Sequence, residues 1–222
     1  MFEPQKRIEG YRHLMPDLRG FGSAPAADDA MSMASYARDL LSAIGEDRFV
    51  LAGFSMGGYI AMELLRQVPD RIAALLLLDT RETADTEEAR ANRYKQADDV
   101  AKNGIGSVVE AMLPKMVVQE EYRADVRRIM ESASPRGVIA ALKAMATRPD
   151  STETLRNATM PAFVIVGDRD EITPLRDAER MVSLLPNAEM APIARAAHMA
   201  NFEASEQVNN LIAAFLGRAL RT

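Results

Sequence analysis

The segment Gly53-Phe54-Ser55-Met56-Gly57 decides the fold of this chain. The apolar stretch before its serine, Arg48–Gly53 (RFVLAG), is typical of a buried strand. The stretch after it, MGGYIAMELLRQV, predicts a helix that ends before Pro69. A serine between a buried strand and a helix predicts a sharp turn that exposes its hydroxyl as a nucleophile. The alternative is a tight glycine turn with an incidental serine, and the flanking strand and helix favour the nucleophile.

The small residues around the serine fit such a turn. A sharp strand-to-helix turn requires very small residues two positions before and two positions after the serine. Gly53 and Gly57 occupy these positions, and Gly58 would let the helix pack closely. The start of the helix places the backbone N–H of Met56 beside Ser55, where it can stabilise an oxyanion.

A serine hydroxyl is a poor nucleophile and needs a base, for which the sequence offers His198. In serine sites built on such a turn, the acid and then the histidine follow the nucleophile along the chain. His198 follows Ser55, and His13, the other histidine of the chain, precedes it. His198 lies after a weak apolar run and before the last amphipathic helix, so we predict that it is the base.

The acid is expected in the loop that follows the apolar run Ala162–Val166, where three carboxylates compete. We predict Asp170, because the next helix begins at Ile172-Thr173-Pro174 and leaves Asp170 at the apex of the loop. Asp170 would hold the histidine in the required tautomer and stabilise the imidazolium. Asp168 is expected to fix the loop by accepting backbone N–H groups, and Glu171 to be solvated.

The rest of the chain alternates apolar runs with amphipathic helical segments, which predicts an α/β fold with a mostly parallel sheet and helices on both faces. Pro192 restricts one strand to an edge or a strand end. Strands are expected at Arg48–Gly53, Ala73–Leu78, Ala162–Val166 and Glu189–Ile193, and His13–Met15 is expected to end another. Helices are expected from Ser32 or Ser35 to Gly45, after Ser55 to about Val68, at Leu175–Leu185 and at Ser205–Leu220.

Residues 83–148 differ from the remainder, because they are rich in Ala, Glu, Arg, Lys and Met and contain no convincing strand. We predict three or four helices inserted between two core strands as a small lid. The chain would then be one structural domain with a core of residues 1–82 and 149–222 around the lid. The methionines of the lid fill the core or form an adaptable ligand surface: Met112, Met116, Met130 and Met145.

Composition limits the classes of function. The 222 residues carry a net charge of −5, which offers no basic surface to nucleic acid or to an anionic membrane. The absence of cysteine excludes disulfides, thiol catalysis and thiolate metal sites, and two histidines exclude a histidine-rich metal site. The N-terminus lacks the apolar run of a signal peptide. We expect a cytoplasmic protein without metal or organic cofactor, and the sequence gives no indication of its oligomeric state.

With these residues placed, the chain resembles the α/β-hydrolase-fold family over essentially its whole length. The resemblance lies in four stretches: Pro16–Ser23 (PDLRGFGS), Gly53–Gly58 (GFSMGG), Gly167–Pro174 (GDRDEITP), and His198 with Asn201 and Glu203. Within the family, the chain is similar above all to the small serine esterases and 3-oxoadipate enol-lactonases. This resemblance implies a catalytic triad of Ser55, Asp170 and His198, with the Met56 N–H as one oxyanion donor.

The resemblance breaks at the N-terminus. Family members carry an apolar strand and a His-Gly loop ahead of the segment that resembles Pro16–Ser23, and that loop supplies the second oxyanion N–H. Residues before Pro16 do not match it, and Met1–Gln5 resembles the helix that normally follows the loop. The family pattern places the strand between the one ending near Met15 and the one ending at Gly53. Without that strand, buried edges would be left with unpaired backbone groups. We therefore expect one of three situations: the sequence begins at an internal methionine of a longer gene product, the sheet closes up without the strand, or a partner chain supplies it.

Three hypotheses about function follow. The first is a serine hydrolase that cleaves a small-molecule carboxylic ester or lactone through an acyl-enzyme. The second is a truncated or non-catalytic protein of the same fold that binds a small ligand or a partner. The third is perhydrolase or haloperoxidase-like activity, in which peroxide replaces water at the acyl-enzyme. The sequence does not identify substrate-binding residues, although Arg81 and Arg136 could meet an anionic substrate group.

Overall fold

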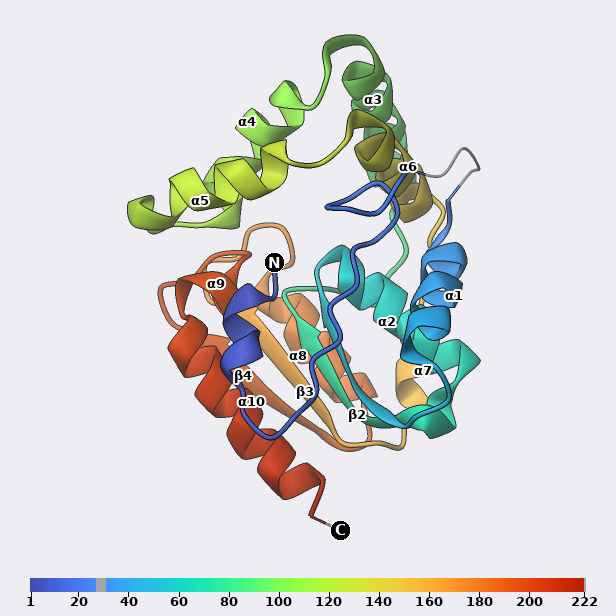
Figure 1. Ribbon diagram of the computed structural model, residues 1–222, viewed down its shortest axis with the longest axis vertical. Coiled ribbons are helices and arrows are strands. Elements are labelled where there is room, and N and C mark those ends of the chain that lie inside the picture. The colour runs from blue at the N-terminus through green and yellow to red at the C-terminus, as the bar shows by residue number, and fades with distance from the viewer. Residues whose placement is uncertain (27–30, 222) are drawn as a thin grey trace.

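Four parallel strands form the sheet, in the order β1-β2-β3-β4 (Figure 1). The structure is a computed structural model that describes residues 1–26 and 31–221. The strands are β1 (Phe49–Phe54), β2 (Ile72–Leu78), β3 (Ala162–Gly167) and β4 (Ala188–Ile193). Each matches an expected strand to within one residue at either end, and Pro192 lies in β4 at the edge of the sheet.

The helices also follow the sequence closely. Ser32 caps α1 in a reciprocal capping box with Ser35, and Gly45 follows its last residue. The helices of the core are η1 (Glu3–Arg7), α1 (Met33–Ile44), α2 (Met56–Gln67), η2 (Pro69–Arg71), α7 (Thr152–Arg156), α8 (Leu175–Leu184), α9 (Ala200–Glu203) and α10 (Ser205–Ala219). Between β2 and β3 lie α3 (Glu87–Asn103), α4 (Gly106–Met116), α5 (Glu120–Glu131) and α6 (Pro135–Ala146).

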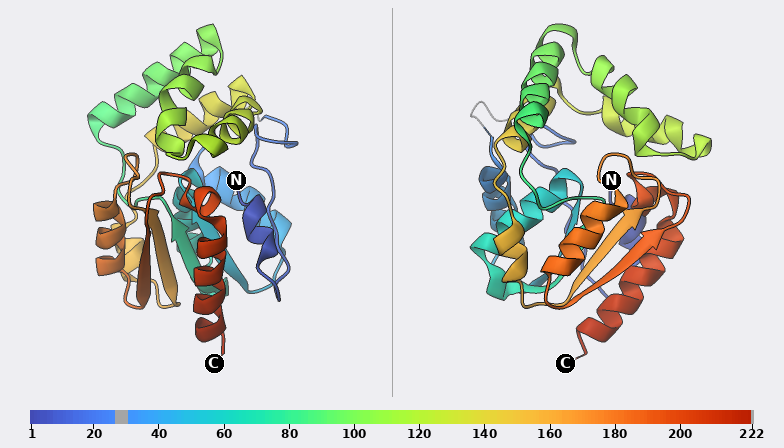
Figure 2. Two further views of the ribbon diagram at one scale, coloured as in Figure 1. Left: turned by 90° about the vertical axis from the view of Figure 1, so that its left-hand side faces the viewer. Right: turned by 180° about the vertical axis from the view of Figure 1, so that it is seen from behind.

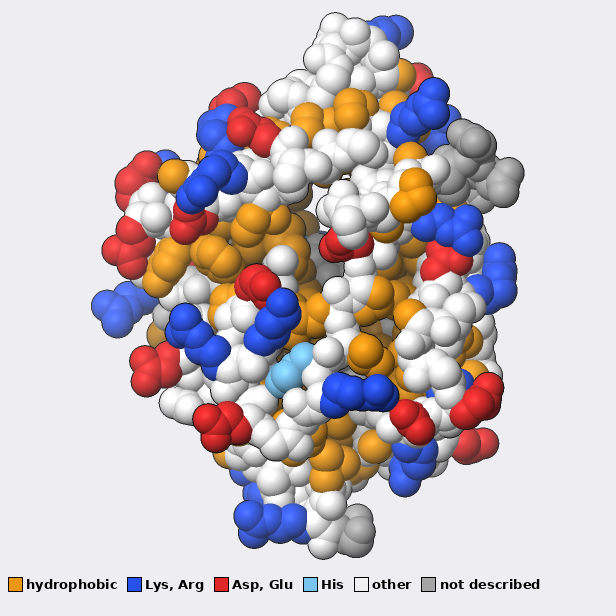
Figure 3. Space-filling view, in the orientation of Figure 1, with side chains coloured by type: hydrophobic (Ala, Val, Ile, Leu, Met, Phe, Trp, Pro, Cys, Tyr) orange, Lys and Arg blue, Asp and Glu red, His pale blue; other side chains and the backbone are white. Residues whose placement is uncertain are grey.

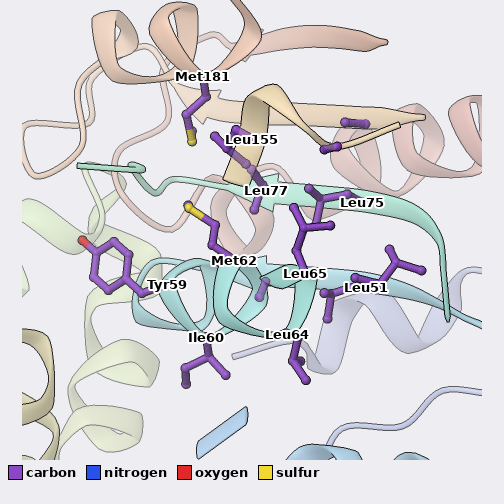
Figure 4. Packing of buried hydrophobic residues seen from close by; sticks show 14 of the residues in the cluster. Leu51, Tyr59, Ile60, Met62, Leu64, Leu65, Leu75, Leu77, Leu155 and Met181 are labelled. Carbon is purple, nitrogen blue, oxygen red and sulfur yellow. The ribbon is translucent and has the colours of Figure 1, made fainter. Parts of the chain in front are cut away.

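Two hydrophobic cores lie on opposite faces of the sheet, because successive side chains of a strand point to opposite sides. Leu75 and Leu77 of β2 pack in one cluster with residues of α1, α2 and α8. Leu76 and Leu78 pack in the other with residues of α9 and α10. Figure 4 shows Leu65 of α2 reaching toward β2, whereas Ile60 and Leu64 extend from the other side of that helix. Helices therefore cover both faces, as expected of a parallel sheet.

The helices α3 to α6, here called the helical insertion, stand above the carboxyl ends of the strands (Figures 1 and 2). They form two pairs, α3 with α6 and α4 with α5. Met112, Met116 and Met130 pack into the hydrophobic cluster on the α10 side of the sheet, and Met145 packs against α3 and α6 neighbours. Packing of this kind agrees with methionines that fill the core.

The expected strand ending at His13–Met15 is wrong: this stretch is extended but belongs to no ladder. A strand needs an adjacent strand for its backbone hydrogen bonds, and a cavity of about 1000 Å³ lies between this stretch and β1. Residues 11–18 line the cavity on one side, and the residues of β1 other than Gly53, with Ser55 and Met56, line it on the other. We call this space the β1 cavity. β1 consequently ends the sheet, with no strand on its far edge among residues 1–26 and 31–221.

Candidate active site

Ser55 lies on a strained turn between β1 and α2. Its φ of 51° and ψ of −118° fall outside the regions that a residue with a Cβ ordinarily adopts. Two hydrogen bonds hold it there: its N–H donates to the Leu78 carbonyl over 3.0 Å, and Thr80 Oγ1 donates to the Ser55 carbonyl over 2.8 Å. Neighbouring β2 therefore fixes the turn that presents the serine hydroxyl.

The crowding around this turn differs in part from the sequence prediction. A Cβ on Gly53 would come within 2.5 Å of the Gly57 carbonyl oxygen, and a Cβ on Gly58 would collide with the Thr80 side chain. A Cβ on Gly57, in contrast, would meet nothing within 4 Å. The prediction that Gly57 must be small for lack of space is wrong, because its α-hydrogens face an open region and the close contacts are made by its backbone.

The three residues predicted to form a triad come together at the carboxyl ends of three strands. Ser55 follows β1, Asp170 lies in the loop after β3, and His198 lies in the loop after β4. Ser55 Oγ is 2.7 Å from His198 Nε2, and His198 Nδ1 is 2.9 Å from Asp170 Oδ2. His198 and Asp170 are buried, and Phe54 packs its ring 5.2 Å from that of His198. Hydrogen bonds thus connect the carboxylate to the serine through the imidazole.

Asp170 is held in an ionised form by its surroundings. Burial alone would raise its pKa, but the hydrogen bond and charge of His198 and the bonds from Thr173 together lower the pKa below its usual range. Asp170 Oδ1 accepts the N–H groups of Ile172 and Thr173 over 2.7 and 3.0 Å. Thr173 Oγ1 donates to the other oxygen over 2.5 Å. A carboxylate so held can orient the imidazole and balance its positive charge.

The other two carboxylates of this loop do not reach His198. Asp168 Oδ1 accepts the Arg195 N–H over 2.8 Å and so ties this loop to the histidine loop, in keeping with the predicted role of fixing backbone. Glu171 is exposed, as expected.

The backbone N–H of Met56 begins α2, next to Ser55. An N–H in the first turn of an α-helix has no carbonyl partner within the helix and carries part of the positive end of the helix dipole. It is therefore suitably placed for negative charge that develops beside Ser55. Met56 and Ser55 both border the β1 cavity, so this side of the serine is open to it.

Asp79 is a buried carboxylate beneath the site that sequence reasoning missed. It directly follows β2, is 1% exposed, and has a φ of 43°. Its Oδ1 accepts the Gly167 N–H over 2.8 Å, at the start of the loop that carries Asp170. Burial raises the pKa of Asp79 well above its usual range, and the nearby charge of Asp170 adds to this effect. The signal that could have revealed it is an acidic residue at the end of an apolar run.

Arg81 is engaged within the protein. Its guanidinium donates to the Ile172 carbonyl, and its Nε lies 3.2 Å from Asp177 Oδ2. It therefore supports the loop that carries Asp170. Arg136 is the second residue of α6, and a role for it in substrate binding stays a prediction.

Hydrophobic side chains gather on the face of the molecule that Figure 3 shows. They lie beneath α4 and α5 and on both sides of the extended N-terminal segment. Within the described part of the chain, six large hydrophobic side chains are exposed, and five line the β1 cavity: Met1, Tyr11, Leu14, Met15 and Leu220. In the same part, no helix combines the length and apolar character needed to cross a bilayer.

Known proteins resemble the chain both in sequence and in structure. The curated pimeloyl-[acyl-carrier protein] methyl ester esterase of Legionella pneumophila (strain Paris) is 30% identical over 197 residues, which is 85% of this chain and 77% of that protein. A solved esterase structure from Thermogutta terrifontis has 36% identity and a TM-score of 0.87, covering 92% of this chain and 79% of that one. The enol-lactonase of Burkholderia xenovorans LB400 shares the fold at 21% identity, with a TM-score of 0.81 and coverage of 90% and 79%.

The family comparison covers most of the chain. The profile described as the alpha/beta hydrolase fold matches residues 3–205, a span that includes the strands, the helical insertion and the loops carrying Ser55, Asp170 and His198. Together with the parallel sheet and the strand-to-helix turn at Ser55, this match assigns the chain to the alpha/beta hydrolase fold family.

Proposed function

We propose that the protein is a serine hydrolase that cleaves a small carboxylic ester or lactone through an acyl-enzyme. The observation that carries the proposal is the 2.7 Å contact between Ser55 Oγ and His198 Nε2, continued by the 2.9 Å contact from His198 Nδ1 to Asp170. A serine becomes nucleophilic when a base within hydrogen-bonding distance can take its proton. The names of two relatives described above, both esterases, support the ester as substrate.

The first half of the reaction transfers the acyl group to the enzyme. His198 Nε2 takes the Ser55 proton while Oγ attacks the carbonyl carbon, and the carbonyl oxygen becomes an oxyanion beside the Met56 N–H. Asp170, which is ionised, accepts a hydrogen bond from Nδ1–H and stabilises the imidazolium. When the tetrahedral intermediate collapses, His198 Nε2 gives its proton to the leaving alkoxide, which departs as an alcohol.

The second half releases the acid. His198 Nε2 takes a proton from water as the water oxygen attacks the acyl-enzyme, and a second oxyanion forms in the same place. Its collapse breaks the bond to Ser55 Oγ, and the oxygen recovers a proton from His198. A lactone follows the same steps, except that its leaving alcohol stays attached to the acyl group until water releases the hydroxy acid.

The test is hydrolysis of p-nitrophenyl acetate by the purified wild-type chain, with Ser55→Ala and Asp170→Asn beside it. Ser55→Ala should abolish turnover, because no acyl-enzyme can form. Asp170→Asn should lower kcat by about 10⁴, since an amide N–H facing Nδ1 favours the tautomer that cannot accept the serine proton. Turnover unchanged in Ser55→Ala would refute the mechanism, and both variants should keep the wild-type circular dichroism spectrum.

A second candidate is a non-catalytic protein of this fold that binds a small ligand. The observation favouring it is the β1 cavity, which borders Ser55 and leaves the Met56 N–H as the one oxyanion donor that we assign. Loss of one such donor typically lowers kcat by about 10²–10³. Wild-type turnover indistinguishable from Ser55→Ala, in folded protein, would favour this candidate over the hydrolase.

A further inference from the structure

Glu203 is a buried acidic residue that the proposed reaction leaves without a role. It is the last residue of α9 and is 5% exposed. Its carboxylate accepts three backbone N–H groups, all within 2.8 Å, and these belong to two segments far apart in the sequence. Burying a carboxylate costs desolvation free energy, even where neutral donors satisfy its hydrogen bonds. The segments that donate to Glu203 therefore indicate its role in the protein.

One of these segments is the connection between α4 and α5 in the helical insertion. Val118 and Gln119 donate their N–H groups to Glu203 Oε1 over 2.7 and 2.8 Å. Gln119 is the N-cap of α5, and its own side chain does not cap the helix. Glu203 therefore supplies negative charge at the N-terminus of α5, where the helix dipole favours it.

The other segment is the loop that carries the proposed base. Glu203 Oε2 accepts the N–H of Ala197, the residue before His198, over 2.7 Å. Ala197 is 1% exposed, so its N–H depends on a protein acceptor. One residue beyond His198, the Met199 N–H donates to the Met116 carbonyl at the end of α4 over 2.8 Å. The histidine loop is thus attached to the helical insertion on both sides of the imidazole.

The packing between the same two segments is apolar. The rings of Tyr122 in α5 and Phe202 in α9 meet edge to face, with centroids 5.6 Å apart. Met116 and Val117 share a hydrophobic cluster with Met199 and Ala200. Non-directional packing of this kind holds two segments together, whereas hydrogen bonds to one rigid carboxylate fix their relative position.

We propose that Glu203 is a positioning residue that couples the α4–α5 connection to the imidazole of His198. One oxygen holds the insertion and the other holds the backbone beside the base, so displacement of the α4–α5 connection displaces His198 relative to Ser55 Oγ. A glutamine cannot replace it, because the amide nitrogen would present its hydrogens to a backbone N–H. For turnover the inference rests on the proposed hydrolase function, but the coupling itself can be measured without activity.

The experiment uses NMR of protein labelled in its two histidines, His13 and His198. His13 contacts the Ile8 carbonyl in the N-terminal segment and serves as an internal control. The variants are Glu203→Gln, Gln119→Pro and the double variant. Proline at position 119 removes one N–H donor to Glu203 and tolerates the local φ of −81°. Gln119→Ala, which keeps that N–H, is the matched control for the loss of the side chain.

Glu203→Gln and Gln119→Pro should each move the ring signals of His198 and leave those of His13 in place. The two effects should be non-additive in the double variant, because both break the same connection. In the ester assay each should lower kcat by about 10- to 100-fold with little change in KM, as expected for a displaced base. Glu189→Gln, at an exposed ion pair with Arg218, controls for loss of a carboxylate and should match the wild type.

The coupling is refuted if Glu203→Gln lowers the melting temperature while the His198 signals stay unchanged, which is the result for a purely structural residue. It is also refuted if Gln119→Pro moves His198 no further than Gln119→Ala does. If the wild-type chain fails to turn over esters, the proposed function fails, and the NMR comparison still decides whether Glu203 couples the two segments.

Discussion

Asp79 and Asp170 lie at the carboxyl ends of neighbouring strands, yet their surroundings act on them in opposite directions. Asp170 accepts hydrogen bonds from Thr173 and His198, which outweigh the effect of burial and lower its pKa. Asp79 is buried with fewer donors, so its pKa is raised. The pKa values of these two acids thus shift in opposite directions: donors lower that of Asp170, which faces the imidazole, and burial raises that of Asp79, which accepts the Gly167 N–H.

The unfolding free energy of Asp79→Asn, taken relative to that of the wild type, should increase as pH rises. The folded protein keeps the Asp79 proton above the ordinary aspartate pKa of about 3.9, where the unfolded chain loses it. The folded state therefore binds more protons, and the free energy of unfolding falls with pH from that value up to the raised pKa. Asparagine has no proton to lose.

The measurement is urea unfolding of both proteins from pH 4 to pH 9. The difference in unfolding free energy should shift in favour of Asp79→Asn across this range. A difference that is constant with pH would mean that Asp79 has an ordinary pKa in the folded protein. A shift in favour of the wild type would mean that the buried carboxylate is ionised and stabilised by its contacts.

At the scale of residues, the sequence predicted candidate site residues where a chemical type coincides with a particular position in the chain. Ser55 follows a strand and precedes a helix, and Asp170 and His198 occupy loops after later apolar runs. Glu203 was part of a resembling stretch, but its contacts with Val118 and Gln119 depend on how the insertion docks, which no local pattern reveals. Asp79 was missed because an acidic residue that ends an apolar run is also what an ordinary strand end looks like, and its burial depends on the packing of neighbouring strands.

At the scale of elements, the glycines in the unit formed by β1, the turn and α2 differ in how much space surrounds them. Gly53 and Gly58 lie against backbone and against Thr80, while Gly57 faces open space. Thr80 in turn holds the Ser55 carbonyl. The conformation of the serine therefore depends on contact between two strands and a helix as much as on the residues that flank the serine.

Gly58→Ala should destabilise the protein, and Gly57→Ala one residue earlier should not. A methyl group at position 58 forces Thr80 aside at a cost of about 1–3 kcal/mol. At position 57 the methyl group meets nothing, and alanine in place of glycine in a helix gains up to about 1 kcal/mol. Thermal unfolding of the two variants decides this, and equal losses at both positions would contradict the assigned packing.

Elements whose signals are local were predicted well. Serine and glycine at its ends marked α1, and continuous apolar runs marked the four strands of the sheet. The stretch at His13–Met15 has the composition of a strand end but forms no ladder, because a strand also requires a neighbour. Composition indicates the propensity of a segment to form a strand, whereas strand pairing depends on whether another strand lies next to it.

At the scale of the whole molecule, the main feature is the edge of β1, which faces the β1 cavity. The Ser55 N–H points to Leu78 of β2, and backbone groups alternate in direction along a strand. Leu51 and Gly53 therefore point their N–H groups toward β2 as well, while Val50, Ala52 and Phe54 point theirs toward the β1 cavity. Ala52 is exposed although it lies in the middle of its strand.

Hydrogen exchange should record this alternation. The amides of Val50, Ala52 and Phe54 should exchange faster than those of Leu51 and Gly53, because the first set lacks a β2 carbonyl as acceptor. Exchange measured residue by residue by NMR tests the pattern. Uniform protection along β1 would show that another segment pairs with this edge in solution.

The free edge also has a consequence for how the protein survives heating or refolding. The β1 amides that point away from β2, together with exposed apolar side chains such as Leu14 and Met15, form a template on which another chain can add a strand. Such addition depends on encounters between molecules, whereas folding does not. The yield of refolded protein should therefore fall as the protein concentration rises, because more chains aggregate. A lysine introduced beside this edge should reduce that loss.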